Sequence, residues 1–340
     1  MESILQVRDL RTSFLTSNGE VKSVRGVSFD VEKGKTLGIV GESGSGKSVT
    51  SLSILKLLGP TGRVKAGSIK LDGEEITGKS RKEMRAIRGG RIAMIFQDPM
   101  TSLNPLIPLG DQVGEMIWEH NRSMPKAERQ QKVLELFRMV RIPEPEKRLK
   151  SYPHEFSGGM RQRVMIAMAL ACKPQLLIAD EPTTALDVSI QDQILKLMRS
   201  LQKEMGMSIM FITHDLGVVA ELCDRVAVMY GGLLMEEADI VDIFNRPMHP
   251  YTLGLMASIP DMNQDRAKKL QPIPGSPPDM IHPPKGCPFA PRCPYAMGIC
   301  TEEIPPYVAT GENRRSMCWL LDPECPAAGN PFKAGKEAAV

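Results

Sequence analysis

A glycine-rich segment that ends in a lysine and a serine is the first candidate for chemistry in this chain of 340 residues. It reads Gly41-Glu-Ser-Gly-Ser-Gly-Lys-Ser48 and fits the pattern G-x-x-x-x-G-K-[ST]. Its glycines let the backbone curl until N–H groups point at phosphate oxygens, and a helix that begins there adds partial positive charge. Lys47 is expected to pair with the β and γ phosphates, and the Ser48 hydroxyl to coordinate Mg²⁺. The segment therefore predicts a nucleoside triphosphate site, with these residues in contact with ATP: Gly41, Glu42, Ser43, Gly44, Ser45, Gly46, Lys47 and Ser48.

Two apolar strands and one helix are needed to hold this loop in place. Residues 37–40 predict a buried strand before the loop, and residues 49–58 predict a helix that ends at Gly59-Pro60. A second apolar strand, 176–180, ends in Asp180, a carboxylate suited to hold Mg²⁺ through its water shell. Glu181 follows directly and can reach a water behind the γ phosphate, as general base or as positioner. These elements predict an ATP-hydrolysing site rather than a glycine-rich turn alone.

Composition describes a folded chain of about two domains. Apolar residues make up 42% and charged residues 24%, and no apolar run reaches the roughly 18–20 residues that span a bilayer. Lys and Arg number 43 against 40 Asp and Glu, a net charge of +3 that argues against a nucleic-acid partner. The first residues lack the pattern of a secretory signal. We therefore expect a cytoplasmic protein.

The two parts of the chain differ in pattern. Residues 1–240 alternate short strands with helical patterns, which predicts an α/β domain with a sheet covered by helices. After residue 240 lie 17 of the 27 prolines, and proline disfavours long helices and central strands. We expect residues 241–340 to form a proline-rich extension of loops and short turns, held together by something other than a large core.

A further set of motifs resembles the ABC ATPases. Phe156-Ser-Gly-Gly-Met-Arg-Gln-Arg163 precedes an apolar helix that Ser157 is placed to cap, and it resembles the family's signature motif. Gln97, Ala185-Leu-Asp187 and His214 follow in the order of the family's Q-loop, D-loop and switch histidine. The resemblance covers roughly residues 4–240. It implies an ABC-type P-loop NTPase fold with a RecA-like core, an antiparallel β subdomain and a helical subdomain.

The resemblance also implies roles for residues that the phosphate-binding loop does not include. In this family two domains pair head to tail, so that Ser157, Gly158 and Gly159 of one chain close over ATP on the other. His214 would contact the γ phosphate, and Gln97 would sense Mg²⁺ and the attacking water while linking to the transport partner. Phe14 is the candidate to stack on adenine. The implied catalytic set is Glu181, His214, Gln97 and Lys47, with Ser48, Gln97 and Asp180 around Mg²⁺.

Other segments are similar to the dipeptide/oligopeptide importer subfamily, in particular its D-type subunit. They are Ile95-Phe-Gln-Asp-Pro-Met-Thr-Ser-Leu-Asn-Pro105, His249-Pro-Tyr-Thr252 and Pro274-Gly-Ser-Pro-Pro278, and they extend the resemblance to about residue 325. The implied assembly has two membrane permeases, a solute-binding protein and two identical or different ATPase subunits at the cytoplasmic face of the membrane. Nickel or glutathione importers are alternatives, because cargo is chosen elsewhere. A soluble ABC ATPase acting on ribosomes or DNA is less well matched, since one cassette without heptads is present.

Five of the seven cysteines lie in the extension: Cys287, Cys293, Cys300, Cys318 and Cys325. Clustered cysteines in a reducing compartment favour a metal over disulfides. Zinc sites use paired C-x₂₋₄-C segments, which are missing here, whereas an iron–sulfur cluster is larger than one ion and tolerates wider spacing. The spacing alone leaves both open. The importer resemblance implies a [4Fe–4S] cluster on Cys287, Cys293, Cys300 and Cys318, structural rather than redox-active, and leaves Cys325 without an assigned role.

Overall fold

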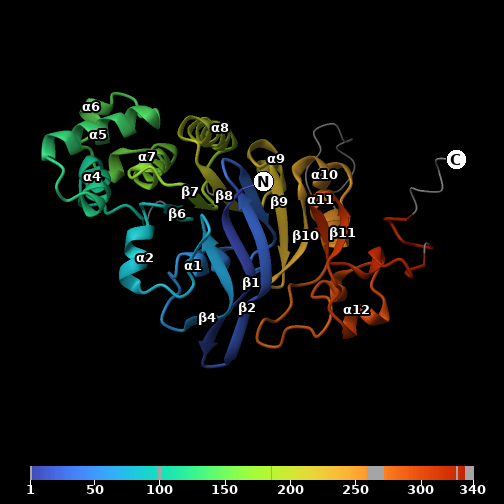
Figure 1. Cartoon of the computed structure of the whole chain (residues 1–340). Coiled ribbons are helices and arrows are strands. Elements are labelled where there is room, and N and C mark those ends of the chain that lie inside the picture. Colours follow the sequence, from blue (N-terminus) through green and yellow to red (C-terminus); the bar gives the residue numbers. More distant parts are fainter. Residues whose placement is uncertain (1, 99–101, 185, 259–271, 327, 334–340) are drawn as a thin grey trace.

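The computed structural model describes residues 2–98, 102–184, 186–258, 272–326 and 328–333. Two sheets and a group of helices make up the molecule (Figure 1). The first half of the chain contains β1 (Ser3–Thr16), β2 (Gly19–Glu32), β3 (Thr36–Val40), α1 (Lys47–Ile54), β4 (Gly62–Leu71), β5 (Glu74–Glu75), α2 (Arg81–Ile87), β6 (Ile92–Ile95), α4 (Leu109–His120), α5 (Lys126–Met139), α6 (Pro145–Arg148) and α7 (Gly158–Leu170). The second half contains β7 (Leu176–Asp180), α8 (Val188–Met205), β8 (Ser208–Thr213), α9 (Leu216–Leu222), β9 (Arg225–Tyr230), β10 (Leu233–Asp239), α10 (Ile240–Asn245), α11 (Pro250–Ala257), α12 (Gly298–Glu302), β11 (Val308–Gly311) and β12 (Arg314–Ser316).

The larger sheet places the ends of several strands at one edge. Its strand order is β11-β12-β10-β9-β3-β8-β7-β6, in which β9, β3, β8, β7 and β6 run parallel to one another and β10 is antiparallel to β9. These parallel strands are buried and almost continuously apolar, as expected for a sheet covered on both faces. The loops after β3, β7 and β8 therefore meet at the same edge, which is where ligands bind in open α/β sheets.

The smaller sheet is antiparallel, with the order β2-β1-β4-β5. Its inner face shares one apolar core with the large sheet, in which Val7 and Phe29 of the small sheet join Ile178 and Ile212 of the large one. Ile54, at the end of α1, belongs to the same core. Helix α1 is thus packed between the two sheets, and its first residue is held close to the edge where the strands end.

The helices α4, α5, α6 and α7 gather on one side of the molecule, and the extension lies on the opposite side (Figure 1). Val133 of α5 and Val164 of α7 are fully or almost fully buried in the second apolar core. The expected fold class, an ABC-type cassette with a RecA-like core, an antiparallel β subdomain and a helical subdomain, is confirmed by this architecture.

The extension is joined to the cassette by backbone pairing and by side-chain packing. Strand β12 pairs with β10 through Glu236↔Ser316 and Glu237↔Arg315, so β11 and β12 continue the large sheet. Phe289 and Met317 of the extension are buried in the same core as Val164. Ile240, at the boundary expected from the sequence, is the first residue of α10 and directly follows β10.

Within the described part of the chain, the helices are all too short or too polar to cross a membrane.

Candidate nucleotide site and cysteine cluster

The glycine-rich loop connects β3 to α1 and is shaped by two glycines with left-handed backbone. Gly44 has φ +78° and Gly46 has φ +102°. A Cβ atom on Gly46 would lie 2.5 Å from the carbonyl oxygen of Ser23, and one on Gly41 would overlap the carbonyl of Met229. The loop is therefore pressed against β2 and β9, which only glycine permits. The first N–H groups of α1 have no acceptor within the helix and remain available to an anion.

Lys47 and Ser48 begin α1 and face the loop and strand β7. Lys47 is 5% exposed, and its ammonium donates to the carbonyl oxygens of Gly41 at 2.7 Å and Glu42 at 3.0 Å. The Ser48 hydroxyl donates to Asp180 Oδ1 at 3.0 Å. A hydroxyl beside a strand-end carboxylate is a donor set that suits Mg²⁺, so these residues fit the ion that nucleotides carry.

Burial disfavours the charged form of Asp180. The residue is 4% exposed, and burial raises its pKa to about 6 even though Ser48 donates to it. Burial also lowers the pKa of Lys47, against the attraction of Glu181 and Asp180. A buried ammonium beside a buried and a partly buried carboxylate is typical of a functional site.

Glu181 is the centre of a second group of polar residues. Its Oε2 accepts from Gln97 Nε2 at 3.1 Å and from the Thr184 hydroxyl at 3.0 Å, and its Oε1 lies 3.3 Å from His214 Nδ1. Its own φ is +46°, and its N–H donates to the carbonyl of Ile212 at 2.9 Å. A non-glycine residue in this backbone region is uncommon and is often found at functional sites. The structure thus brings Gln97, Glu181 and His214 together, as the resemblance implies.

The serine and glycines of the signature segment lie outside this group. Ser157 caps α7, accepting from the N–H of Met160 at 3.4 Å, and both Ser157 and Gly158 are exposed. A Cβ on Gly159 would lie 2.6 Å from Ile190 Cγ2 of α8. Within the described residues, no contact joins this segment to the phosphate-binding loop of the same chain, and its helix start is open to solvent. Ala185 of the expected D-loop lies outside the described residues.

Phe14 lies in β1, opposite Val21 of β2 and Gly62 of β4, and is half-buried. Its ring packs on Gly62, because a Cβ there would lie 2.8 Å from Phe14 Cε1. Its proposed contact with adenine stays a prediction.

The cysteines of the extension are all free thiols. Cys287, Cys300 and Cys318 are buried and Cys293 is partly exposed, and the N–H of Cys287 donates to the carbonyl of Cys300 at 2.8 Å. Burial, reinforced by the charges of the other three thiols, raises the pKa of Cys318 to about 12. In the described ranges, no three His, Cys, Asp or Glu side chains are arranged to hold a single metal ion. Cys318 therefore interacts with the other three thiols, but these side chains are not arranged as the ligands of one zinc ion.

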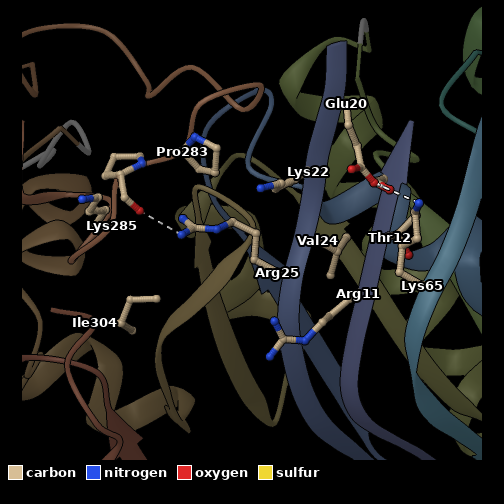
Figure 2. A pocket seen from close by; sticks show the side chains of 12 residues that line it. Arg11, Thr12, Glu20, Lys22, Val24, Arg25, Lys65, Pro283, Lys285 and Ile304 are labelled. Carbon is tan, nitrogen blue, oxygen red and sulfur yellow. Dashed lines mark hydrogen bonds and ion pairs between the residues drawn. The ribbon is translucent and has the colours of Figure 1, made fainter. Parts of the chain in front are cut away.

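The extension also lies beside β2, an edge strand of the small sheet, where the N–H of Lys22 donates to the carbonyl of Met280 at 2.8 Å. A pocket of about 410 Å³ lies there. Figure 2 shows its lining, with residues of β1 and β2 on one side and Pro283, Lys285 and Ile304 of the extension on the other. Arg25 closes one end by donating to the carbonyl of Pro284 at 3.0 Å. These contacts attach the extension to the strand that supports the phosphate-binding loop.

Sequence reasoning missed two residues of the extension that reach the nucleotide site. The Tyr251 hydroxyl accepts from the N–H of Glu42 at 2.9 Å, and Arg292 forms an ion pair with the Glu42 carboxylate at 2.7 Å. Tyr251 lies in the segment His249-Pro-Tyr-Thr252 that resembles peptide importers, so the sequence marked this segment but not its contact with the loop. Arg292 precedes Cys293 directly and carried no signal of its own.

Comparison with known proteins agrees with this geometry. The ABC transporter family matches residues 24–184, and the family "Oligopeptide/dipeptide transporter, C-terminal region" matches residues 235–300. The chain is 54% identical over 329 residues to the oligopeptide transport ATP-binding protein OppD of Bacillus subtilis (strain 168), covering 96% of this chain and 92% of that protein. It is 53% identical over 323 residues to the dipeptide transport ATP-binding protein DppD of the same organism, covering 95% and 96% respectively.

Solved structures give the same result for the cassette. The dimeric ATP-binding cassette MJ0796, in a post-hydrolysis state bound to ADP and Pi, matches with a TM-score of 0.63 and 27% identity, covering 69% of this chain and 98% of that one. The structure of cbiO1 from Clostridium perfringens, part of the ABC transporter complex cbiONQ, matches with a TM-score of 0.63 and 29% identity, covering 72% and 92%.

The fold and the nucleotide site together define an ATP-binding cassette of the ABC class. The chain belongs to the family of ATP-binding subunits of oligopeptide and dipeptide ABC transporters. The transporter C-terminal family matches its extension, and about half of its residues are identical to those of relatives of almost equal length. Its activity is ATP hydrolysis in the service of transport.

Proposed function

We propose that this chain is the ATPase subunit that energises the import of dipeptides or oligopeptides. The observation that carries the proposal is that one chain combines the pairs Ser48–Asp180 and Glu181–His214 beside the phosphate-binding loop with an extension of the peptide-transporter type. The relatives named above are oligopeptide and dipeptide transport ATP-binding proteins. Nickel or glutathione as cargo is the alternative outcome that a transport assay distinguishes.

In this proposal Ser48, Asp180 and Gln97 hold Mg²⁺, and Lys47 and the loop N–H groups hold the phosphates. Bound Mg²⁺ would neutralise phosphate charge and polarise the bond to the γ phosphate. Glu181 is the general base: Gln97 and Thr184 donate to Oε2 and fix the carboxylate, while Oε1, which lies 3.3 Å from His214 Nδ1, is the oxygen placed to accept a proton from water. His214, which lies beside Glu181, would contact the γ phosphate.

The exposed signature segment supports a head-to-tail dimer. Ser157 and Gly158 present a helix start to solvent, with its N–H groups and partial positive charge. We propose that a second cassette, identical or related, brings its ATP to this helix start, while Ser157, Gly158 and Gly159 complete the site from across the interface. The dimer described for MJ0796 is consistent with this arrangement.

A methionine-lined groove supports docking of a permease helix. The groove, about 250 Å³, is lined by Met94, Met116, Met165, Met168 and the exposed Phe96, among others. Methionine adapts its shape to a partner surface, which gives a function to part of the unusual content of 22 methionines. Phe96 is the residue before Gln97, whose amide contacts Glu181, so an occupied groove would be linked to the hydrolytic site. Two permease subunits would hold the ATPase at the cytoplasmic face of the membrane. The solute-binding protein would act on the ATPase indirectly, through the permeases.

The docking proposal is tested by Phe96→Glu, which places a charge in the groove. We expect the variant to lose co-purification with the permeases while its affinity for MgATP is unchanged. Val241→Glu, at an exposed position on α10, is the matched control and should retain the complex. An intact complex with Phe96→Glu would contradict the docking site.

We propose that the chain consists of a cassette, residues 1–240, and an extension, residues 241–340. Four cysteine thiols in the extension support a [4Fe–4S] cluster there. Cys287, Cys293, Cys300 and Cys318 are free, and Cys318 lies near enough to the other three for them to contribute to its raised pKa, although burial is the larger cause. Thiolate is the ligand of such clusters, and a cluster separates its ligands more widely than one ion does. Its role would be to hold a proline-rich segment together.

Metal analysis of the full chain, purified without oxygen, tests the cluster. We expect about four irons and four sulfides per chain and visible absorption. Cys293→Ser should lose both, while Cys172→Ser, a change just after the end of α7, should not. One zinc and no sulfide would overturn the cluster and leave the ATPase assignment unchanged.

Uptake by cells tests the cargo. Cells in which this chain carries Glu181→Gln should lose uptake of labelled dipeptide and oligopeptide, while wild-type cells and cells carrying the exposed change Glu128→Gln take them up. Normal peptide uptake combined with lost uptake of Ni²⁺ or of glutathione would assign the alternative cargo.

A further inference from the structure

The extension makes a direct ionic contact with the phosphate-binding loop. Arg292 ends a 3₁₀ turn (Ala290–Arg292), and its Nη1 donates to Glu42 Oε2 at 2.7 Å and to the Tyr230 hydroxyl at 3.0 Å. The Arg292 side chain is 6% exposed. An ion pair shielded from water in this way interacts more strongly than the exposed pairs elsewhere on this surface.

The remaining donors of Arg292 fix its direction. Nε donates to the carbonyl of Pro274 at 2.8 Å, and Nη2 donates to the carbonyl of Ile273 at 3.0 Å. The guanidinium is a rigid planar fork, so these bonds within the extension hold it in the one orientation that reaches Glu42. Arg292 is therefore set in place by the extension and presented to the loop.

Glu42 is held from a second side by a buried aromatic cluster. Its N–H donates to the hydroxyl of Tyr251, which is fully buried. The rings of Tyr251, Tyr230 and Phe289 lie with their centres 4.6 to 5.4 Å apart. Tyr251 thus fixes the backbone of Glu42, and Arg292 fixes its side chain.

The residue that is held in this way is also the one that supports the phosphate-binding lysine. Lys47 Nζ donates to the carbonyl oxygens of Gly41 and Glu42, so the position of Glu42 sets the space that Lys47 and the loop N–H groups share. A shift of Glu42 would move these donors away from the geometry that binds β and γ phosphates, and donors must be prearranged to bind anions well.

We propose that Arg292 is a positioning residue of the nucleotide site, which fixes the phosphate-binding loop through Glu42 and so makes the extension part of the ATPase. The proposal deepens the ATPase function and rests on it, but it does not depend on the metal content of the extension. A purely structural role would predict a loss of stability without a change in nucleotide affinity.

Equilibrium binding of MgATP to the full chain separates the two roles. We expect Arg292→Gln to raise the dissociation constant about tenfold, a coupling of the usual size between two sites. KM for ATP should rise by a similar factor, whereas kcat at saturating ATP should change less than about twofold, because Arg292 contacts no reacting atom. Glu42→Gln should have the same effect, and the double variant should be no worse than either single variant, as expected for two residues that act through one contact.

Arg315→Gln is the matched control. Arg315 also belongs to the extension and pairs with a buried carboxylate of the cassette, Glu237, at 2.7 Å, but on β10 rather than at the loop. Its loss should lower stability and leave the MgATP dissociation constant unchanged. An effect on MgATP affinity as large as that of Arg292→Gln would show that any loosening of the extension suffices, and would overturn the specific role of Arg292.

Two further results would overturn the proposal. One is a folded Arg292→Gln protein whose MgATP dissociation constant lies within about twofold of the wild-type value. The other is additive effects of Arg292→Gln and Glu42→Gln in the double variant. If Arg292→Gln fails to fold, Arg292→Lys replaces it: lysine keeps the charge without the fork, so a raised dissociation constant supports the proposal and a wild-type value contradicts it. Turnover of the wild type tests the proposed ATPase function separately from the role of Arg292. Iron content measured on the same preparations tests the proposed cluster.

Discussion

Replacing Asp180 with asparagine will stabilise the nucleotide-free protein while abolishing Mg²⁺-dependent nucleotide binding. Asp180 is buried, and burial raises its pKa from an ordinary value of 3.8 to about 6. A difference of this size corresponds to a cost of about 3 kcal/mol for the charged form, because one pKa unit is worth about 1.4 kcal/mol. Asparagine removes the charge and can still accept from the Ser48 hydroxyl. We expect a gain of about 1–3 kcal/mol in the free energy of unfolding at neutral pH.

The pH dependence of this gain distinguishes its cause. Between about pH 4 and pH 6 the folded protein keeps a proton on Asp180 that the unfolded chain releases, so wild-type stability falls as pH rises through this window. The cost is fully present above about pH 6 and absent below about pH 4. The asparagine of the variant does not titrate, so the two proteins should differ most at neutral pH and become equal under acid conditions.

Urea unfolding of both proteins at several pH values, with and without MgATP, is the assay. MgATP should stabilise the wild type and not Asp180→Asn, since ligand that binds only the folded state raises its stability. Asp192→Asn, an exposed change on α8, is the control and should behave like the wild type. An Asp180→Asn variant that is less stable than the wild type at neutral pH would refute the argument that burial makes the charged form of Asp180 unfavourable.

The remaining predictions concern turnover, loop geometry and the second cassette. Glu181→Gln can keep both hydrogen bonds to Oε2, so MgATP binding should persist while phosphate release at saturating ATP falls about 10²–10⁴-fold; release above half the wild-type rate would remove Glu181 from the mechanism. Gly46→Ala should lose MgATP binding, because its Cβ would lie 2.5 Å from the Ser23 carbonyl, whereas Gly59→Ala, which faces open space, should bind normally; equal affinities in a titration would contradict the loop geometry. Ser157→Arg should keep MgATP affinity and lose turnover, measured as phosphate release, because Ser157 acts on the other cassette; normal turnover would argue against the dimer.

The nucleotide site was predictable where its parts are local in sequence. The loop, the strand before it and the helix after it form one continuous pattern, and β7 (Leu176–Asp180) has the bounds that its apolar run predicts. Helix α1 is shorter than predicted, ending at Ile54 rather than at residue 58, because Lys56 adopts φ +51° and turns the chain early. The ABC architecture was predictable only through the order of several motifs.

The contacts of the extension were not predictable from local pattern. Arg292 and Glu42 are far apart in the chain, and a charged residue at either position is ordinary by itself. Strand β12 (Arg314–Ser316) has only three residues, too few to show the alternation that identifies a strand, yet it pairs with β10 and buries Ser316. The methionines of the groove come from separate helices and strands, so their shared surface is visible only after folding.

The most direct test of the central claim is ATP hydrolysis by the assembled transporter in lipid vesicles, measured as phosphate release with and without peptide-loaded solute-binding protein. We predict that peptide stimulates hydrolysis by the wild-type complex and that Glu181→Gln abolishes both the basal and the stimulated rate. Hydrolysis that persists in Glu181→Gln, or that never responds to peptide, would contradict the assignment of this chain as the subunit that powers peptide import.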